Sequence, residues 1–352
     1  MDRIGSAIID FTEAAYDLEL SDEEWLPTIL KRGLPVLEHG LGVAGMRYGR
    51  PPEGGPFQLL DIHVASGRED FAERHAAALA TTPPEVLREQ VRPGMAGTAS
   101  MHSQGDPERL AHYTSHVDYC KDLLYMTAVD SKGSGVAIVA PLAEVTTLSD
   151  QDAQRWQMLA AHVDAGHRLR QGLATQEACE EPHTDLPYDA EAIFDAGGFR
   201  ITDAVGQAQE RTATMKLRDA AVTVDRARGR MRETDPERAL QTWKALVRGR
   251  WSMVDWFDTD GRRFVLALPN APRVSDPRGL TERESQIVAY AVLGQTNKMI
   301  AYRLGLSQSR VSTLLRSVMR KLNVQTRAQL VLKMRDFQAL HVPADDPDRN
   351  PG

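Results

Sequence analysis

The sequence predicts a multidomain protein in which α+β domains are followed by an all-α, four-helix C-terminal domain. The chain has 352 residues, enough for two or three domains of ordinary size. Polar stretches with two prolines each, at 176–188 and 271–279, divide it into three segments. Short apolar runs typical of strands occur in the first two segments, whereas the third has the three- and four-residue apolar spacing of helices.

Charge is distributed unevenly along the chain. Residues 280–337 contain ten Lys and Arg against three Asp and Glu, although the whole chain has a net charge of −7. The front of the chain is therefore strongly acidic, and a compact basic module follows it. Such a module suits a polyanionic partner.

Several classes of protein are disfavoured by what the sequence lacks. It has neither a signal-peptide pattern nor an apolar run of about 18 residues, so we expect a cytoplasmic protein without membrane segments. Two cysteines, Cys120 and Cys179, cannot form a disulfide framework. P-loop, G-x-S-x-G and H-E-x-x-H motifs are missing, as is the parallel strand–helix alternation of a two-component receiver. We expect no enzyme activity.

The first segment, residues 1–175, alternates helical stretches with four apolar runs. These runs are G-V-A-G-M-R-Y, F-Q-L-L-D-I-H-V-A, L-L-Y-M-T-A-V and G-V-A-I-V-A-P-L. A long helix is predicted from Ser149 to Leu173, with apolar residues Trp156, Leu159 and Val163 on one stripe as candidate dimer contacts. This order is similar to a GAF domain, which implies a sensor and dimerisation domain.

The second segment, residues 189–270, is predicted as two strand pairs separated by helices. The first pair is a hairpin around Gly197-Gly198, and the second turns around Asp260-Gly261. A charge-rich helical stretch lies between them, from about Glu210 to Val247. The arrangement resembles a PAS-like sensor domain.

The basic module, residues 280–337, has a capping signal at the start of each predicted helix. Thr281 and Glu284 form a capping box, Asn297 and Ser307 are candidate caps for the second and third helices, and Thr326 with Gln329 opens a fourth. Gly294 and Gly305 end the first two helices. Two short helices joined at Gly305 make a helix-turn-helix. The remainder, 338–352, is predicted to be a disordered tail.

The third helix of this module has two different faces. Val311, Leu314, Leu315, Val318 and Leu322 form an apolar stripe. We define its outer face by the other side chains, which are arginines and small hydroxyl residues without a carboxylate: Ser309, Arg310, Ser312, Thr313, Arg316, Ser317 and Arg320. Short side chains allow close approach to a duplex, while arginines reach phosphates and guanine edges. We predict that this face binds double-stranded DNA.

The segments L-T-E-R-E, G-Q-T-N-K-M-I-A-Y-R-L-G-L-S and V-S-T-L-L-R-S-V-M-R-K-L-N-V-Q-T-R-A-Q-L resemble the C-terminal DNA-binding domain of the LuxR/NarL superfamily. The resemblance implies a bacterial transcription regulator whose third helix enters the major groove and whose fourth supports dimerisation. It adds Lys298 and Lys321 to the DNA-binding residues, with which we also count the capping Ser307, and Leu330, Val331 and Met334 as dimer contacts. Arg310, Ser312 and Leu314 replace the family's frequent Thr, Lys and His, so the operator sequence does not carry over.

Other partners stay open at this point. The alternative function is a regulator whose helix-turn-helix docks mainly on a protein, either polymerase or another regulator. A homodimer is expected, RNA polymerase and a small-molecule ligand of the front domains are further candidates, and no cofactor is required by the sequence. The signal, and activation against repression, are not specified.

One group of metal-ligand residue types occurs in the first segment. His112, His116 and Cys120 are spaced to lie on one face of a helix. The outer two would lie roughly 12 Å apart along the axis, too far to converge easily on one ion. We therefore predict no metal site, with this trio as the minor alternative.

Overall fold

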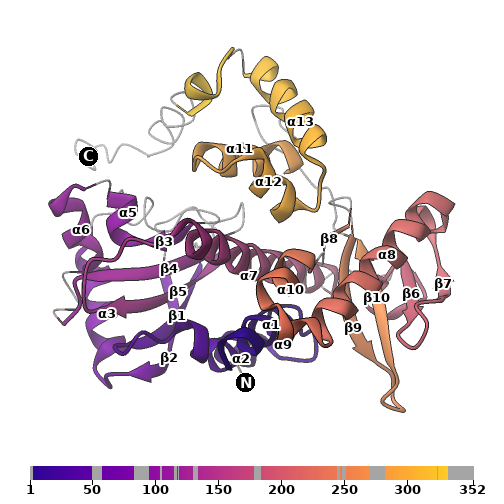
Figure 1. Cartoon of the computed structure of the whole chain (residues 1–352), viewed down its shortest axis with the longest axis horizontal. Coiled ribbons are helices and arrows are strands. Elements are labelled where there is room, and N and C mark those ends of the chain that lie inside the picture. The colour runs from indigo at the N-terminus through magenta and orange to yellow at the C-terminus, as the bar shows by residue number, and fades with distance from the viewer. Residues whose placement is uncertain are drawn as a thin grey trace, which may run out of the picture. The chain divides into compact units, whose positions relative to one another are not determined.

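A computed structural model describes residues 3–49, 58–82, 95–103, 105–114, 117, 119–129, 134–177, 184–243, 246–247, 251–269, 282–322 and 324–331 (Figure 1). The chain divides into two compact units. The first is Met1–Ala271 with Arg303–Gly305, and the second, Pro272–Tyr302 with Leu306–Gly352, holds most of the C-terminal helices. The middle of the predicted linker at 176–188, all of that at 271–279, and the predicted tail at 338–352 lie outside the described residues.

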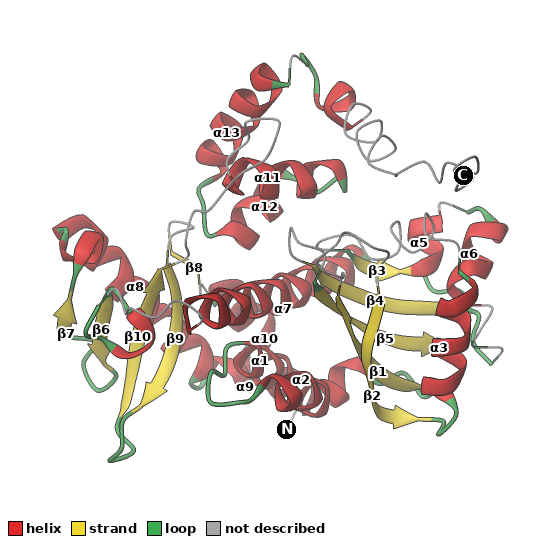
Figure 2. Ribbon diagram, turned by 180° about the vertical axis from the view of Figure 1, so that it is seen from behind, coloured by secondary structure: helices red, strands yellow, loops and turns green. Residues whose placement is uncertain are grey.

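The first unit contains two antiparallel five-stranded sheets, drawn in yellow in Figure 2. The strand order is β2-β1-β5-β4-β3 in the first sheet and β7-β6-β10-β9-β8 in the second. Numbered within each sheet, the two orders are the same. The first sheet consists of β1 (Gly42–Gly49), β2 (Gln58–Gly67), β3 (Ala96–Thr98), β4 (Asp122–Val129) and β5 (Gly135–Leu142). The second consists of β6 (Ala192–Asp195), β7 (Ile201–Ala204), β8 (Leu246–Val247), β9 (Trp251–Phe257) and β10 (Arg263–Pro269).

Helices cover both faces of the first sheet. Because neighbouring residues of a strand point to opposite faces, Gly45 and Tyr48 of β1 mark the two sides. A side chain at Gly45 would collide with Leu30 of α2 (Asp22–Leu37), whereas the Tyr48 hydroxyl lies 3.4 Å from Nε2 of His75 in α3 (Phe71–Thr81). The short helices α5 (Ala99–Ser103) and α6 (Pro107–Thr114) also contact the sheet, at β4.

The long helix α7 (Asp150–Glu177) begins where the sequence predicted, since the backbone N–H of Asp152 donates to the Ser149 hydroxyl. It packs against α1 (Arg3–Ala15) so closely that a Cβ at Gly166 would overlap the Ala15 carbonyl oxygen. In the same contact the Tyr16 hydroxyl lies 2.9 Å from Nδ1 of the buried His162, and burial lowers the pKa of His162 to about 3. This side chain is therefore neutral at physiological pH.

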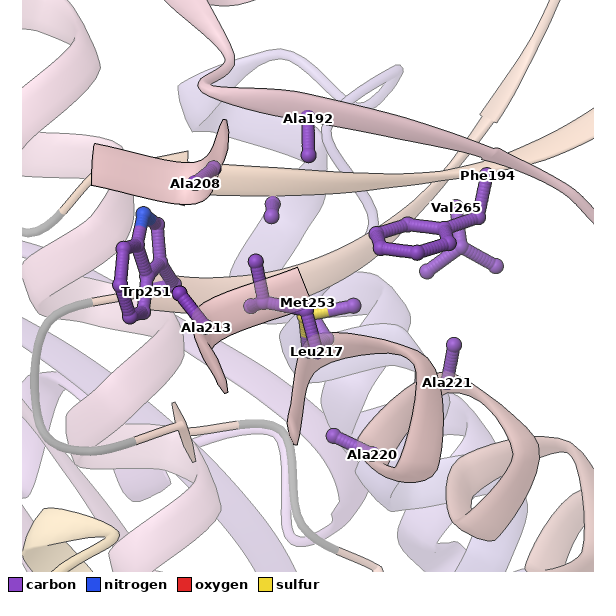
Figure 3. Packing of buried hydrophobic residues seen from close by; sticks show 11 residues of the cluster. Ala192, Phe194, Ala208, Ala213, Leu217, Ala220, Ala221, Trp251, Met253 and Val265 are labelled. Carbon is purple, nitrogen blue, oxygen red and sulfur yellow. The ribbon is translucent and has the colours of Figure 1, made fainter. Parts of the chain in front are cut away.

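The second sheet is covered on one face by α8 (Arg211–Arg228), and α9 (Met231–Thr234) and α10 (Pro236–Thr242) follow it. The core between α8 and the sheet is rich in alanine (Figure 3), and its buried residues are Ala192, Phe194, Ala208, Ala213, Leu217, Ala220, Ala221, Trp251, Met253, Val265 and Ala267. Small side chains allow the helix to lie close to the strands. Both predicted strand pairs are confirmed. The helical stretch between them, predicted to reach about Val247, ends at Thr242, and Leu246–Val247 form strand β8 instead.

Partly buried ion pairs join α1 to the second half of this unit. Nε of Arg228 lies 2.6 Å from Glu13, and the guanidinium of Arg232 contacts Asp10. Arg228 also pairs with Asp255 of β9. Among the described helices, none is apolar over a length that would cross a bilayer.

Candidate nucleic-acid interface

Three helices of the second unit are α11 (Glu282–Val292), α12 (Asn297–Leu304) and α13 (Gln308–Lys321), drawn in yellow tones in Figure 1. Gly294 and Gly305 follow the first two with φ of +79° and +60°. The backbone N–H of Gln295 donates to Tyr290 O and that of Leu306 to Ala301 O, the bonding expected where a left-handed glycine ends a helix. Both predicted helix ends are confirmed.

The prediction for the start of α12 was wrong by one residue. The backbone N–H of Met299 donates to the hydroxyl of Thr296, so Thr296 caps this helix. Asn297 instead donates from Nδ2 to the Ser312 hydroxyl at 3.1 Å. Its side chain therefore joins α12 to α13. The predicted cap of α11, Thr281, lies outside the described residues.

Helix α13 begins as predicted, because the Ser307 hydroxyl accepts from the backbone N–H of Arg310 at 3.2 Å. The apolar stripe is buried at four of its five positions, namely Val311, Leu315, Val318 and Leu322, and Leu314 is half-buried. This stripe packs the helix against the rest of the unit and determines which residues face outward.

The exposed part of the outer face consists of Ser309, Arg310, Thr313, Arg316 and Arg320. Lys298 of α12 and the capping Ser307 are exposed as well. Within the described part of the chain no carboxylate pairs with any of the three arginines; Arg316 Nε only approaches the Ser312 carbonyl oxygen, at 3.4 Å. Their charges are thus available to phosphates or base edges.

Three residues predicted to bind DNA have partners inside the unit. The Ser317 hydroxyl and the Lys321 ammonium donate to the two carboxylate oxygens of Glu284, at 2.9 and 2.6 Å. Glu284 is 3% exposed. The hydroxyl of Ser312 is taken by Asn297, as described above. These contacts fix α13 to α11 and α12, and the sequence interpretation missed them. The signal available was an acid-poor module, in which each carboxylate is a candidate partner for the basic third helix.

A second internal contact involves Arg327, which we counted with the basic residues of the module. Its Nη2 donates to the carbonyl oxygens of Ala291 (3.2 Å) and Gln295, and its Nη1 to Asn297 Oδ1 at 3.3 Å. The guanidinium thus satisfies carbonyls at the end of α11. Burial lowers the pKa of Arg327.

The fourth predicted helix begins as expected. Residues 327–331 are helical, the Thr326 hydroxyl accepts from Gln329 N at 3.1 Å, and Gln329 Oε1 accepts from Thr326 N at 3.3 Å. This is the predicted capping box.

The six residues predicted as dimer contacts are mostly buried in the single chain. Leu330 is buried and Val331 half-buried, while Met334 lies outside the described residues. Trp156, Leu159 and Val163 of α7 are 5%, 1% and 1% exposed. A dimer contact through these three requires that part of α7 to be uncovered, and the role of all six stays a prediction.

The possible metal site at His112, His116 and Cys120 required all three residues to lie on one face of a helix. Helix α6 ends at Thr114, and Cys120 lies beyond it in a turn, where its N–H donates to Val117 O. Cys120 therefore does not share a helix face with His112. The side chains of His112 and His116 lie outside the described residues. Over the described ranges no three His, Cys, Asp or Glu side chains are grouped to hold a metal ion.

Comparison with known proteins gives one family match. Residues 278–334 match the family described as bacterial regulatory proteins, luxR family. No curated protein matches the chain. The matched residues span all three C-terminal helices and the start of the fourth. The C-terminal unit of the chain therefore carries a DNA-binding helix-turn-helix domain of the luxR family.

Proposed function

We propose that this protein is a signal-responsive transcription regulator that binds a two-fold operator as a dimer, with the outer face of α13 in the major groove. The family of the C-terminal domain supports a role in transcription regulation. What carries the assignment to α13 is its exposed face, in which three arginines without carboxylate partners in the described chain alternate with short hydroxyl side chains.

We divide the predicted DNA-binding residues by role, using their exposure and their polar partners as support. We assign base or phosphate contacts to Ser309, Arg310, Thr313, Arg316 and Arg320, which are exposed. Lys298 and Ser307, exposed near the start of α12 and α13, are placed to contact phosphates. We assign Ser312, Ser317 and Lys321 to holding α13 in position, because their polar groups contact Asn297 and Glu284.

The front unit is proposed as the sensor, with a GAF-like module at 1–175 and a PAS-like module at 189–270. The support is the topology: both sheets have the same strand order, and in both at least one helix lies between the first strand pair and the third strand. Two states of this unit with different packing would change whether both copies of α13 reach successive major grooves.

In vitro selection from random duplexes tests this proposal. We expect the full chain to enrich an inverted repeat, because a two-fold dimer places two equal helices about one helical turn apart. Arg310→Ala and Arg316→Ala should each weaken binding to the selected duplex about tenfold. The control, Arg238→Ala at an exposed position of α10, should bind like the wild type.

Two results would contradict the proposal. Failure of the folded protein to bind any duplex at low salt would favour the alternative, a helix-turn-helix that docks on a protein. Enrichment of a single, unrepeated site would keep DNA binding and reject the two-fold dimer.

A further inference from the structure

Helix α8 presents a second arginine-bearing surface, in the first unit. Arg211, Met215, Arg218, Val222 and Arg226 follow each other at intervals of three or four residues, so they lie along one side of the helix; we name them the α8 stripe. The buried side chains of α8 are Ala213, Leu217, Ala220, Ala221, Val224 and Ala227, which by their spacing occupy the opposite side. Four of them, Ala213, Leu217, Ala220 and Ala221, are labelled in the core in Figure 3. The stripe extends over roughly 22 Å of helix axis.

The α8 stripe is accessible to solvent and lacks a carboxylate. Its three arginines are exposed, Met215 is 59% exposed and Val222 is half-buried. Arg218 Nε donates to the carbonyl oxygen of Phe199, a contact that leaves its charge uncompensated. Within the described chain no ion pair involves any of the three arginines.

The acidic residues nearest in sequence do not neutralise the stripe. Asp225 pairs with Arg263 at 2.9 Å. Asp219 borders the stripe but forms no ion pair in the described chain, and Glu210 precedes the helix. The net character of this side of α8 is thus cationic, with apolar groups between the charges.

This combination of exposed arginines with apolar residues between them suits a protein–protein interface. Arginine and methionine are enriched in such interfaces. The flexible apolar side chain of methionine adapts to the surface of a partner. Duplex DNA would use the arginines but would leave Met215 and Val222 without apolar contacts.

A second copy of α8 is a poor binding partner for the α8 stripe. About a two-fold axis, an antiparallel pair centred near Arg218 would place Arg211 opposite Arg226 of the other copy and bring the two Arg218 side chains together. A parallel pair would place each arginine beside its equivalent. Like charges at these spacings repel.

We propose that the α8 stripe binds an acidic amphipathic helix of a partner protein. Carboxylates of the partner would pair with the three arginines, and its apolar residues would contact Met215 and Val222. Such pairing of helix faces uses the same three- and four-residue spacing on both partners. The surface lies on a different unit from α13 and does not depend on the function proposed for that helix.

The test uses the full chain and a designed, fluorescein-labelled helical peptide of 18 residues with a leucine stripe flanked by glutamates. The reference peptide replaces every glutamate with lysine. Fluorescence anisotropy should show saturable, salt-sensitive binding of the acidic peptide alone. The triple variant Arg211→Glu, Arg218→Glu, Arg226→Glu should weaken it about 30-fold, and Met215→Asp about tenfold.

Matched controls separate the stripe from general charge effects. Arg238→Glu on α10 and Met101→Asp on α5, where Met101 is 46% exposed, should change peptide affinity less than twofold. Far-ultraviolet circular dichroism checks that the variants fold, and the milder Met215→Ala, expected to weaken binding about threefold, replaces any variant that does not.

Four outcomes would overturn the proposal. These are equal binding of the acidic and lysine peptides, unchanged binding by the triple variant, a change of oligomeric mass in that variant by sedimentation, and a loss of duplex affinity in it as large as in Arg316→Ala. The third outcome would indicate a contact between copies, and the fourth would make α8 part of the DNA surface.

Discussion

Helices α8 and α13 both present arginines to solvent from an amphipathic helix, but the residues between the arginines differ. On α13 they are serines and threonine, such as Ser309 and Thr313, whereas on α8 they are Met215 and Val222. Short hydroxyl groups allow a backbone or a phosphate to approach, while apolar groups gain free energy only against another apolar surface. The neighbours of an arginine, more than its charge, indicate which partner it binds.

The two helices also differ in how they are held. Helix α8 is seated by an alanine-rich apolar core, whereas α13 has, beside its apolar stripe, a buried carboxylate that accepts from Ser317 and Lys321. The packing of α8 is therefore sensitive to changes in side-chain volume, and that of α13 to changes in charge. Substitutions in the two packing contacts should affect the two surfaces separately.

The largest expected effect comes from making a cavity in the apolar core beneath α8. Leu217 is fully buried, and its neighbours Ala213, Ala220 and Ala221 are too short to fill the cavity that Leu217→Ala would leave. We expect a loss of about 4 kcal/mol in the free energy of unfolding of the first unit. Denaturant titration measures it, and DNA binding under conditions where both units stay folded should be unchanged. An unchanged free energy of unfolding would mean that Leu217 does not pack α8 against the sheet as described.

On α13, Lys321→Met and Arg316→Ala should differ in their effect on stability. Lys321→Met keeps the aliphatic stem but leaves the carboxylate of Glu284 buried without its cation, which should cost about 3 kcal/mol in the stability of the C-terminal unit. Arg316→Ala should cost almost nothing, because Arg316 is exposed. Adding Glu284→Gln to Lys321→Met should recover part of the loss. Equal stabilities of the Lys321 and Arg316 variants would contradict the division of roles on this helix.

Acid should weaken the unit that carries α8 through His162. The unfolded residue takes up a proton below about its ordinary pKa of 6.5, whereas the folded one does so only near 3. Stability that is fully present above pH 6.5 is therefore lost as the pH falls toward 3, by roughly 2 kcal/mol at pH 5. Replacing His162 with glutamine, which offers Tyr16 a polar partner and cannot titrate, should flatten this part of the stability profile. An unchanged profile would rule out the buried, neutral histidine as its source.

The smallest expected effect on stability is at the N-terminal caps of α13 and α8. Ser307 caps α13 with its hydroxyl, so Ser307→Ala should cost about 1 kcal/mol. Glu210 precedes α8 without a side-chain capping bond, and Glu210→Ala should change stability by less than about 0.5 kcal/mol. Thermal unfolding of the two variants compares them directly. A larger effect at Glu210 than at Ser307 would reverse this assignment.

Much of the fold could be predicted because its signals are local. Alternating or continuous apolar runs indicated the long strands, such as β4 and β5, and the turn residues Gly197 and Gly261 marked the hairpins. Ser307, and Thr326 with Gln329, marked helix starts that the structure confirms. The three-residue β3 and two-residue β8 were missed, since strands so short leave no period to detect.

The candidate site was predictable in its outline and not in its internal contacts. The apolar stripe of α13 fixed which residues face outward, so Arg310, Arg316 and Arg320 could be placed from sequence. The partners of Ser317 and Lys321 could not, because Glu284 is more than 30 residues away and only tertiary packing brings it near. Thr296 and Asn297 are both good caps, and the choice between them depended on whether Asn297 had another partner in Ser312.

The central claim, that the exposed arginines of α13 bind duplex DNA, is tested most directly by the salt dependence of operator affinity. Removing an arginine that binds a phosphate should reduce the slope of log K against log salt concentration by about one. We expect Arg310→Ala and Arg316→Ala to weaken binding, with a shallower slope where the arginine binds a phosphate, and the triple reversal on α8 to leave affinity and slope at wild-type values. Wild-type affinity and slope in both α13 variants would contradict the account.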